Sequence, residues 1–302
     1  MNENDLVRIG QTDLWVSRIG VGTNRWGKQR KADLSLRDTF SAALEAGFTL
    51  FDSAEIYNFG GSEKTLGAFL DANHRPLIVT SKFLPLPWRF GKQNLLNALE
   101  ASLKRLNLSC LDLYLIHMQW PPVPVENWMD ALADVKEKGL VRAVGVSNFD
   151  APHLRRAYAA LQTRGIPLAC NQMEYSLLKK DVESNGVKAT CQELGVTLVA
   201  YRPFAGGFLT GKYSKENPPK GPRRWMYRVG DFNKISVLLK NMQRISDRHG
   251  GKPLSQVALN WLTAKGALPI PGSTKVSHVR ESAGALEWSL SADEIALLDE
   301  VS

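Results

Sequence analysis

The sequence contains few cysteines and no long apolar run. Its three cysteines, Cys110, Cys170 and Cys191, are odd in number and include no Cys-x-x-Cys pair. Such a set argues against a disulfide framework and a zinc site, so we expect a reducing compartment and no bound metal. The first ten residues are polar and acidic, and no run reaches the roughly eighteen apolar residues of a membrane-spanning helix. We therefore expect a cytoplasmic protein that does not associate with membranes.

Nucleic-acid-binding patterns are also missing. Lys and Arg number 38 against 30 Asp and Glu, which gives a formal net charge of +8. This excess favours an anionic ligand without specifying one. The densest basic patch, KGPRRWMYR at residues 220–228, has no helix-turn-helix, zinc-finger or RNA-binding pattern beside it. We interpret it as a solvated loop and expect no nucleic-acid partner; the sequence predicts no particular oligomeric state.

Eight short apolar runs follow one another along the chain. They begin at residues 18, 48, 77, 111, 141, 168, 196 and 267. Segments with helical spacing lie between most of them, and two of these, residues 34–47 and 127–139, end on glycine as helices often do. The spacing of the runs fits repeated βαβ units. Eight such units with buried parallel strands predict one domain over residues 1–302, a (β/α)₈ TIM barrel.

The main structural alternative is a doubly wound sheet. It would usually carry Gly-x-Gly-x-x-Gly after the first strand, but GVGTNR places Arg25 at the third glycine. Residues 6–20 contain two strand-like runs around residues 11–13, which predicts an N-terminal β-hairpin that plugs the barrel. The long interval from residue 196 to residue 267 predicts an insertion between the seventh and eighth strands. Residues 213–232 within it fit either a lid or a surface loop.

Polar side chains stand at the ends of neighbouring strand-like runs. The second, third and fourth runs end on Asp52, Lys82 and His117, and Tyr57 follows Asp52 in the next loop. In a barrel, chemistry lies where the strands end. An ammonium lowers the pKa of a nearby phenol, a carboxylate keeps that ammonium charged, and a histidine orients a substrate oxygen. Each residue alone is more often structural, but together they predict protonation of a developing alkoxide by Tyr57.

The chain resembles the aldo-keto reductases along essentially its whole length. Matching segments include LFDSAEIYNFGGSE (residues 50–63), VTSK (79–82), LDLYLIH (111–117) and GLVRAVGVSNF (139–149). The resemblance implies a catalytic tetrad made of Asp52, Tyr57, Lys82 and His117. In that tetrad Tyr57 donates a proton while a nicotinamide cofactor delivers hydride to an aldehyde or ketone. Lys82 and Asp52 would tune Tyr57, and His117 would position the carbonyl.

The same resemblance implies a cofactor site. Ser147, Asn148 and Gln172 would hold the nicotinamide carboxamide, although Asn148 is also placed to cap a helix. Tyr201 would stack on the nicotinamide ring. The remaining implied contacts come from three segments and are Gly22, Thr23, Asn24, Arg202, Pro203, Phe204, Gly206, Gly207, Gly211, Gly272, Ser273, Thr274, Lys275, Arg280 and Ser282.

Cofactor preference depends on the segment IPGSTKVSHVRES at residues 270–282. Family members that prefer the phosphorylated dinucleotide often carry a lysine, a serine and an arginine there. Here Gly272 takes the lysine position, Ser273 is kept, and His278 takes the arginine position. Lys275 and Arg280 are close enough in sequence to compensate, and a helix start nearby would add its dipole. We therefore expect NADPH, with NADH as the alternative.

Three tryptophans lie on expected carboxyl-end loops. Trp26, Trp88 and Trp120 predict apolar walls for an aromatic or aliphatic carbonyl substrate, with packing between loops as the alternative. Two other functions stay open. One is a redox-sensing or regulatory protein similar to potassium-channel beta subunits. The other is a lyase or isomerase with Lys82 as a Schiff base, which requires that lysine to be neutral.

Overall fold

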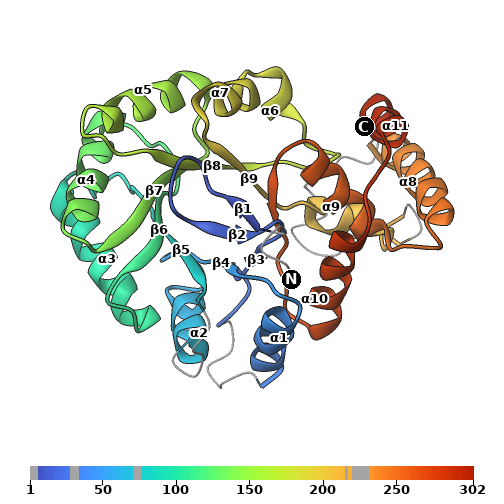
Figure 1. Ribbon diagram of the computed structural model, residues 1–302, viewed down its shortest axis with the longest axis horizontal. Helices are drawn as coiled ribbons and strands as arrows, with labels where there is room; N and C mark the ends of the chain where they lie inside the picture. Colours follow the sequence, from blue (N-terminus) through green and yellow to red (C-terminus); the bar gives the residue numbers. More distant parts are fainter. Residues whose placement is uncertain (1–5, 28–33, 71–75, 215–216, 220–230) are drawn as a thin grey trace.

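Parallel strands surrounded by helices form the centre of the molecule (Figure 1). The computed structural model describes residues 6–27, 34–70, 76–214, 217–219 and 231–302. Eight strands pair in chain order, and they are β3 (Val21–Gly22), β4 (Leu50–Asp52), β5 (Ile78–Phe83), β6 (Leu111–Ile116), β7 (Val141–Ser147), β8 (Leu168–Glu174), β9 (Thr197–Tyr201) and β10 (Leu268–Ile270). Each lies within or beside one of the eight apolar runs, which confirms the strand predictions.

The first and last strands of this sheet meet and close it. Gly22 pairs in parallel with Gly272. The backbone N–H groups of Gly20 and Gly22 donate to the carbonyls of Pro269 and Pro271, each at 2.9 Å. The sheet is therefore a (β/α)₈ barrel, and the doubly wound alternative is excluded.

Helices cover the outside of the barrel. Those that follow the strands are α1 (Leu34–Glu45), α2 (Gly61–Leu70), α3 (Lys92–Leu106), α4 (Val125–Glu137), α5 (Ala151–Gln162), α6 (Asp181–Ser184), α7 (Val187–Leu194), α9 (Leu254–Ala264) and α10 (Val276–Ala283). Short 3₁₀ segments η2 (Ala205–Thr210) and η4 (Gly284–Glu287) and the C-terminal α11 (Ala292–Val301) complete the set. Within the described part of the chain, no helix is long and apolar enough to cross a membrane.

The expected insertion lies between β9 and β10. Its described part includes α8 (Asp231–Arg248), which packs against α11 beside the barrel (Figure 1). Residues 215–216 and 220–230 of the suggested lid lie outside the described residues, so the choice between lid and surface loop stays a prediction.

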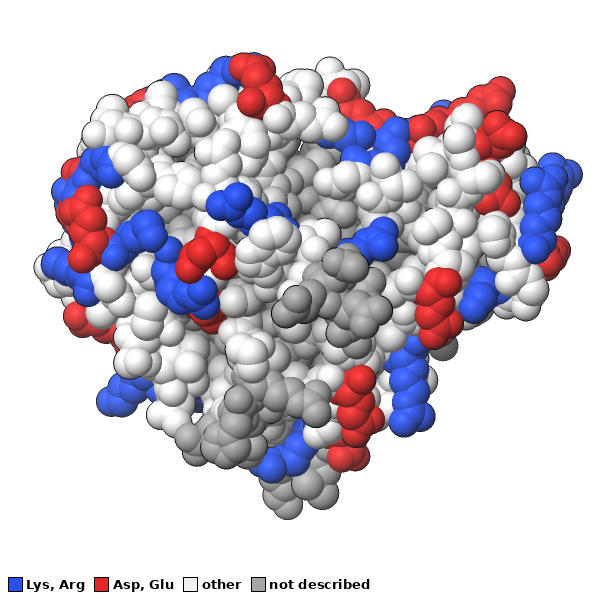
Figure 2. All heavy atoms as spheres, viewed as in Figure 1, with Lys and Arg blue, Asp and Glu red and all other residues white. Residues whose placement is uncertain are grey.

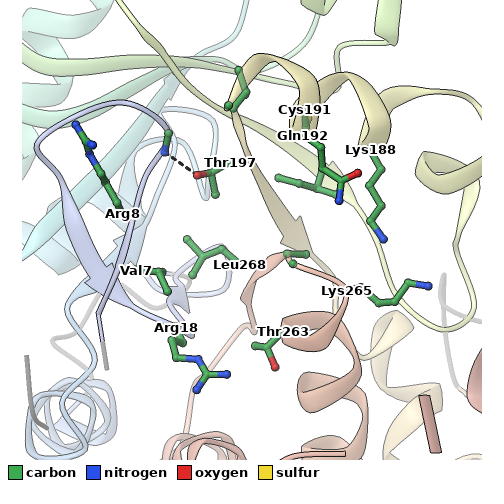
Figure 3. A pocket seen from close by; sticks show the side chains of 16 residues that line it. Val7, Arg8, Arg18, Lys188, Cys191, Gln192, Thr197, Thr263, Lys265 and Leu268 are labelled. Carbon is green, nitrogen blue, oxygen red and sulfur yellow. Dashed lines mark hydrogen bonds between the residues drawn. The ribbon is translucent and has the colours of Figure 1, made fainter. Parts of the chain in front are cut away.

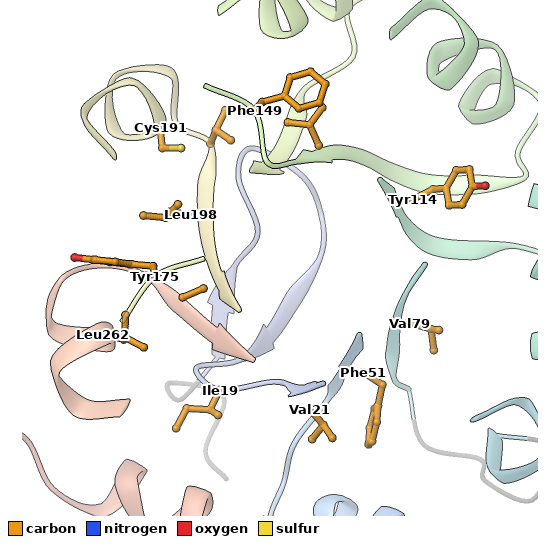
Figure 4. Close-up of a cluster of buried hydrophobic side chains, with 14 of the residues drawn as sticks. Ile19, Val21, Phe51, Val79, Tyr114, Phe149, Tyr175, Cys191, Leu198 and Leu262 are labelled. Atoms are coloured by element: carbon orange, nitrogen blue, oxygen red, sulfur yellow. The ribbon is translucent and has the colours of Figure 1, made fainter. Parts of the chain in front are cut away.

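Strand side chains divide between two cores because successive residues point to opposite faces of a sheet. Phe51, Val79 and Tyr114 point outward toward the helices (Figure 4). Leu50, Ile78 and their counterparts on other strands fill the interior. Full burial of one such side chain contributes about 1.5–3 kcal/mol, so both layers stabilise the barrel. On the face shown in Figure 2, acidic and basic side chains of the described residues are interspersed.

The N-terminal hairpin plugs the barrel as predicted. Its strands β1 (Leu6–Arg8) and β2 (Trp15–Ser17) are antiparallel. Ile9, Leu14 and Val16 are fully buried, and they pack into the interior cluster with residues of the barrel strands. The hairpin therefore completes the apolar core at the amino-terminal end.

Replacing Gly10 by Ala tests this plug. Gly10 has φ +54°, and an added Cβ would lie 2.5 Å from the Ala169 carbonyl oxygen. We expect the free energy of unfolding to fall by about 1–3 kcal/mol, as for overpacked cores. Gly139→Ala is the matched control, since Gly139 has φ +73° but open space around it. Urea denaturation should show a larger loss at residue 10 than at residue 139; equal losses would mean that the plug contact adds nothing.

Candidate active site

Strand alternation explains why a buried strand ends on a charge. Leu50 lies in the interior cluster and Phe51 in the outer one, so Asp52 points into the barrel. Lys82 follows Ile78 by four residues and therefore shares its inward face. Both charges are thereby directed to the carboxyl end of the barrel, where the strands present functional groups.

Other predicted residues reach the carboxyl end of the barrel, which we call the mouth, by the same alternation. Gln172 lies two residues after the inward Cys170, and Tyr201 lies two after the inward Val199. His117 immediately follows β6, two residues after the inward Leu115. One periodicity on several strands thus gathers polar groups that are far apart in the sequence.

The four residues of the predicted tetrad come together. The Lys82 Nζ donates to Asp52 Oδ2 at 2.7 Å and to the Ser53 carbonyl at 2.5 Å, and its distance to the Tyr57 hydroxyl is 3.5 Å. The Lys82 side chain is fully buried. The rings of Tyr57 and His117 meet edge to face with centroids 5.8 Å apart.

Lys82 stays charged in this site. Burial lowers its pKa, but the charge of Asp52, the electrostatic effect of Tyr57 and the hydrogen bonds that Lys82 donates to both outweigh this, so the net shift is upward. A second group holds Asp52 in place, because the Gln172 amide donates to Asp52 Oδ1 at 2.8 Å. A protonated Lys82 does not suit the Schiff-base alternative, which needs a neutral amine.

The pKa of the Tyr57 phenol differs from the expectation drawn from the sequence. Its pKa is raised, because burial outweighs the lowering effect of Lys82, and Asp52 adds to the rise. We expected Lys82 to bring this pKa down. In this structure the phenol instead keeps its proton firmly at neutral pH, which is the state of a proton donor.

His117 is neutral in the folded protein. Burial and the nearby Lys82 charge lower its pKa to about 3. Its Nδ1 atom is buried and has no hydrogen-bond partner among the described residues. Buried polar atoms normally have a hydrogen-bond partner, so a polar ligand bound beside this atom would supply the missing hydrogen bond.

The low pKa of His117 predicts acid sensitivity. Between pH 6.5 and about 3 the unfolded chain protonates this histidine while the folded chain does not, so the unfolded state binds more protons and stability falls as pH falls. We expect His117→Gln to flatten this part of the stability profile, measured by urea denaturation at several pH values. His153→Gln, on the outer helix α5, is the control. Parallel profiles for wild type and His117→Gln would contradict the assignment.

Ser147, Asn148 and Tyr201 form one hydrogen-bonded group beside the tetrad. Asn148 Nδ2 donates to Ser147 Oγ and to the His117 carbonyl, both at 3.0 Å, and the Tyr201 hydroxyl donates to Asn148 Oδ1 at 2.9 Å. The capping alternative for Asn148 is wrong, because Asp150 caps α5 by accepting from the His153 N–H. These three residues therefore hold each other at the mouth.

A loop with unusual backbone follows Tyr201. Arg202, Ala205, Gly206 and Gly207 all have positive φ, and Gly207 reaches +102°. This φ favours glycine, and a Cβ on Gly207 would lie 2.7 Å from the Lys212 ammonium, which shows that this ammonium lies against the loop. Pro203 is buried, Phe204 is half-buried, and Gly211 ends η2. The loop combines left-handed turns with an ammonium, as anion-binding loops do.

A second cationic group lies at the start of α10. The pKa of His278 is lowered first by burial, then by Lys275, with Lys212 and Arg25 also contributing, while Glu281 opposes them. Three cations from different parts of the chain therefore act electrostatically on this histidine. Lys275 is the N-cap residue of α10 and makes no side-chain capping bond. Lys275 is also exposed, so its ammonium stands at the helix N-terminus, where anions are favoured.

The other predicted contacts in these segments differ in exposure. Asn24, Gly272 and Arg280 are exposed and Thr274 is half-buried, whereas Gly22, Ser273 and Ser282 are buried. Thr23 is buried, and its hydroxyl bonds to the Asp52 carbonyl at 2.9 Å and lies 2.7 Å from Ser62 Oγ. Arg202 lies 3.4 Å from Glu174, so this carboxylate partly neutralises the charge of the Arg202 guanidinium.

The structure gives different outcomes for the three tryptophans predicted as pocket walls. Trp26 is fully buried, packs beside Phe51 and Phe69, and donates its indole N–H to the Ser273 carbonyl at 2.7 Å. Its prediction as a pocket wall is therefore wrong. Trp88 and Trp120 remain 68% and 41% exposed, so both are available to a ligand.

Sequence reasoning missed some residues of this mouth. Lys212 and Arg25 were not assigned, although Lys212 directly follows the glycine-rich loop and its position was a usable signal. The bond from Gln172 to Asp52 joins residues 120 apart, and no local spacing indicates it. Glu55 was also missed; it pairs with Arg89 at 2.6 Å and accepts from the Leu84 N–H, which joins the loops after β4 and β5.

The comparisons place this closed (β/α)₈ barrel, with these groups at its carboxyl end, among the NAD(P)-dependent oxidoreductases. The sequence pattern of the Aldo/keto reductase family matches residues 18–302, and the chain belongs to that family. A pyridoxal reductase, described as chloroplastic, from Arabidopsis thaliana is 39% identical over 95% of this chain and 83% of its own length.

Solved structures agree with this membership. A thermostable aldo-keto reductase in complex with the inhibitor epalrestat is 31% identical, with a TM-score of 0.83 over 98% of this chain and 99% of its own. An aldo/keto reductase from Klebsiella pneumoniae in complex with NADP and acetate is 28% identical, with a TM-score of 0.80 over 98% and 94% of the two chains.

Proposed function

We propose that this protein reduces aldehydes or ketones to alcohols with NADPH, and that Tyr57 is the general acid. The observation that carries the proposal is a protonated Tyr57 in contact with a charged, buried Lys82 and next to a neutral His117. This set suits the transfer of a proton to an oxygen on which negative charge develops.

Each residue has one role in the proposal. The O–H bond of Tyr57 breaks as its proton passes to the carbonyl oxygen, and the Lys82 charge stabilises the phenolate left behind. Asp52 holds the ammonium in place at 2.7 Å. His117 donates a hydrogen bond to the carbonyl oxygen and orients it. When bound, NADPH supplies the hydride that reaches the carbonyl carbon.

The chain's own residues also support the cofactor assignment. The group of Ser147, Asn148 and Tyr201 would position the nicotinamide end, and the loop ending at Lys212 would receive the pyrophosphate. Lys275, Lys212 and Arg25 would hold an added ribose phosphate. The Klebsiella relative was solved with NADP, which fits this choice.

We propose aromatic aldehydes as the first substrates to test. Trp88 and Trp120 are exposed on loops that follow β5 and β6, where an apolar ring would stack against them. The similarity to a pyridoxal reductase makes pyridoxal the leading candidate. We infer a cytoplasmic location from the three unpaired cysteines.

NADPH oxidation followed at 340 nm tests the function. We expect turnover with pyridoxal, benzaldehyde and a matched aliphatic aldehyde, each compared with its alcohol as a blank. Saturable NADPH binding without turnover across this panel would overturn the proposal and favour the regulatory alternative.

Cofactor preference gives a further prediction. Lys275→Met should lower kcat/KM for NADPH about tenfold and change that for NADH little, because one charge-assisted contact to the extra phosphate is lost. Lys104→Met, at an exposed position on α3, is the control. Equal efficiencies of wild type with NADPH and NADH would contradict the NADPH assignment.

A further inference from the structure

A cavity lies at the opposite end of the barrel from the candidate active site. It has a volume of about 390 Å³ and is bounded by β1, α7 and the first residues of β9 and β10 (Figure 3). Thr197 and Leu268 are the first residues of β9 and β10. Tyr201 is the last residue of β9 and lies at the other end of the barrel. We call this cavity the basal pocket. Its volume is within the range of about 300–1,000 Å³ that small-molecule sites occupy.

The basal pocket carries unbalanced positive charge. Among the residues that the structure describes, four cationic ones line it, Arg8, Arg18, Lys188 and Lys265, and no aspartate or glutamate does. Figure 3 shows these four side chains around its rim, drawn from different elements.

Carboxylates behind the wall neutralise only part of this charge. Lys265 pairs with Asp299 at 2.8 Å and with Glu183 at 3.1 Å. Lys188 lies 3.7 Å from the same Glu183, so the two lysines share one carboxylate. In the part of the chain that the structure describes, Arg8 and Arg18 have no ion pair with a carboxylate.

The titration of Lys188 agrees with a positive potential in the pocket. Burial lowers its pKa, and repulsion from Lys265 lowers it further, while Glu183 and Asp299 offset only part of this effect. An anion in the pocket would relieve this repulsion.

Apolar groups form much of the remaining wall. Val7, Leu198 and Leu268 line the pocket between the cations. Thr197 Oγ1 accepts from the Gly10 N–H at 2.7 Å, which fixes the hairpin against β9 (Figure 3). The lining therefore combines a rigid apolar surface with cations at its edge, a combination that recognises a ring with one acidic substituent.

We propose that the basal pocket binds a small amphipathic anion, an apolar ring that carries a phosphate or a carboxylate. The anionic group would meet Arg18 and Lys188, and the ring would lie against Val7 and Leu268. This site is separate from the one that would take the cofactor and does not depend on the proposed reduction.

Calorimetric titration of the full chain with phenyl phosphate, without dinucleotide, tests this proposal. We expect saturable binding that Arg18→Gln and Lys188→Gln each weaken about tenfold, the loss of one charge-assisted contact. Lys104→Gln, at an exposed position on α3, removes the same charge away from both sites and should leave the affinity unchanged, whereas Lys275→Gln reports any binding at the catalytic mouth. Benzoate should bind in the same way, and phenol should bind much more weakly.

Hydrogen exchange locates the ligand independently. Phenyl phosphate should protect β1 and α7 rather than the start of α10. Arg18 is exposed, so Arg18→Gln should fold normally, and an unchanged melting temperature would verify this. The proposal is overturned if wild type shows no saturable binding, if Arg18→Gln binds as wild type, or if only Lys275→Gln loses binding.

Discussion

Tyr57→Phe should reduce kcat for carbonyl reduction about 10²–10⁴-fold, the usual contribution of a positioned general acid. The substitution removes only the hydroxyl that lies 3.5 Å from Lys82 Nζ and leaves the ring against His117. Because the lost group acts on the developing alkoxide, the loss should appear in kcat as well as in kcat/KM. Dinucleotide affinity, measured by quenching of protein fluorescence, should be unchanged.

Tyr158→Phe is the matched control for this experiment. Tyr158 lies on α5, outside the barrel mouth, and loses the same hydroxyl. Its turnover should equal that of the wild type. If Tyr57→Phe kept wild-type turnover, another group would donate the proton, and the proposed role of Tyr57 would be wrong.

Much of the fold could be predicted because it depends on local patterns. Apolar runs separated by helical segments gave the eight strands, and a turn at residues 11–13 gave the hairpin. The tetrad followed from a single rule, since residues at strand ends meet at one face of a parallel barrel. Asp52, Lys82 and His117 needed only their position after an apolar run.

What could not be predicted depends on three-dimensional packing. Trp26 follows β3 as a wall residue would, but Phe51 and Phe69 lie close enough to bury it completely. The pKa of Tyr57 is set by burial against the Lys82 charge, and sequence gives the charge but not the degree of burial. The basal pocket likewise joins β1, α7 and β10, which are far apart in the chain.

Lys82→Met should destabilise the protein as well as inactivate it. The Asp52 side chain is only 5% exposed, and without Lys82 it would keep Gln172 as its remaining side-chain hydrogen-bond partner among the described residues. Breaking one side of a buried ion pair typically lowers the free energy of unfolding by about 3–5 kcal/mol. Urea denaturation at pH 7 should show this loss, and Lys104→Met, on the surface of α3, should show little change.

The double variant Asp52→Asn with Lys82→Met separates stability from chemistry. Removing both charges should restore most of the lost free energy of unfolding, because no unpaired charge stays buried. Activity should not return, since no ammonium then stabilises the Tyr57 phenolate. A double variant as unstable as Lys82→Met would show that packing of the lysine side chain, rather than its charge, maintains this site.

The same pair predicts the alkaline limit of stability. The pKa of Lys82 is raised above its ordinary value of 10.5, so its contribution is complete below that pH and disappears as pH rises through the folded-state pKa. Wild type should therefore lose stability above pH 10.5 more steeply than the double variant. Equal slopes would mean that Lys82 is not held in its charged form by Asp52, and the proposed tuning of Tyr57 would lose its physical basis.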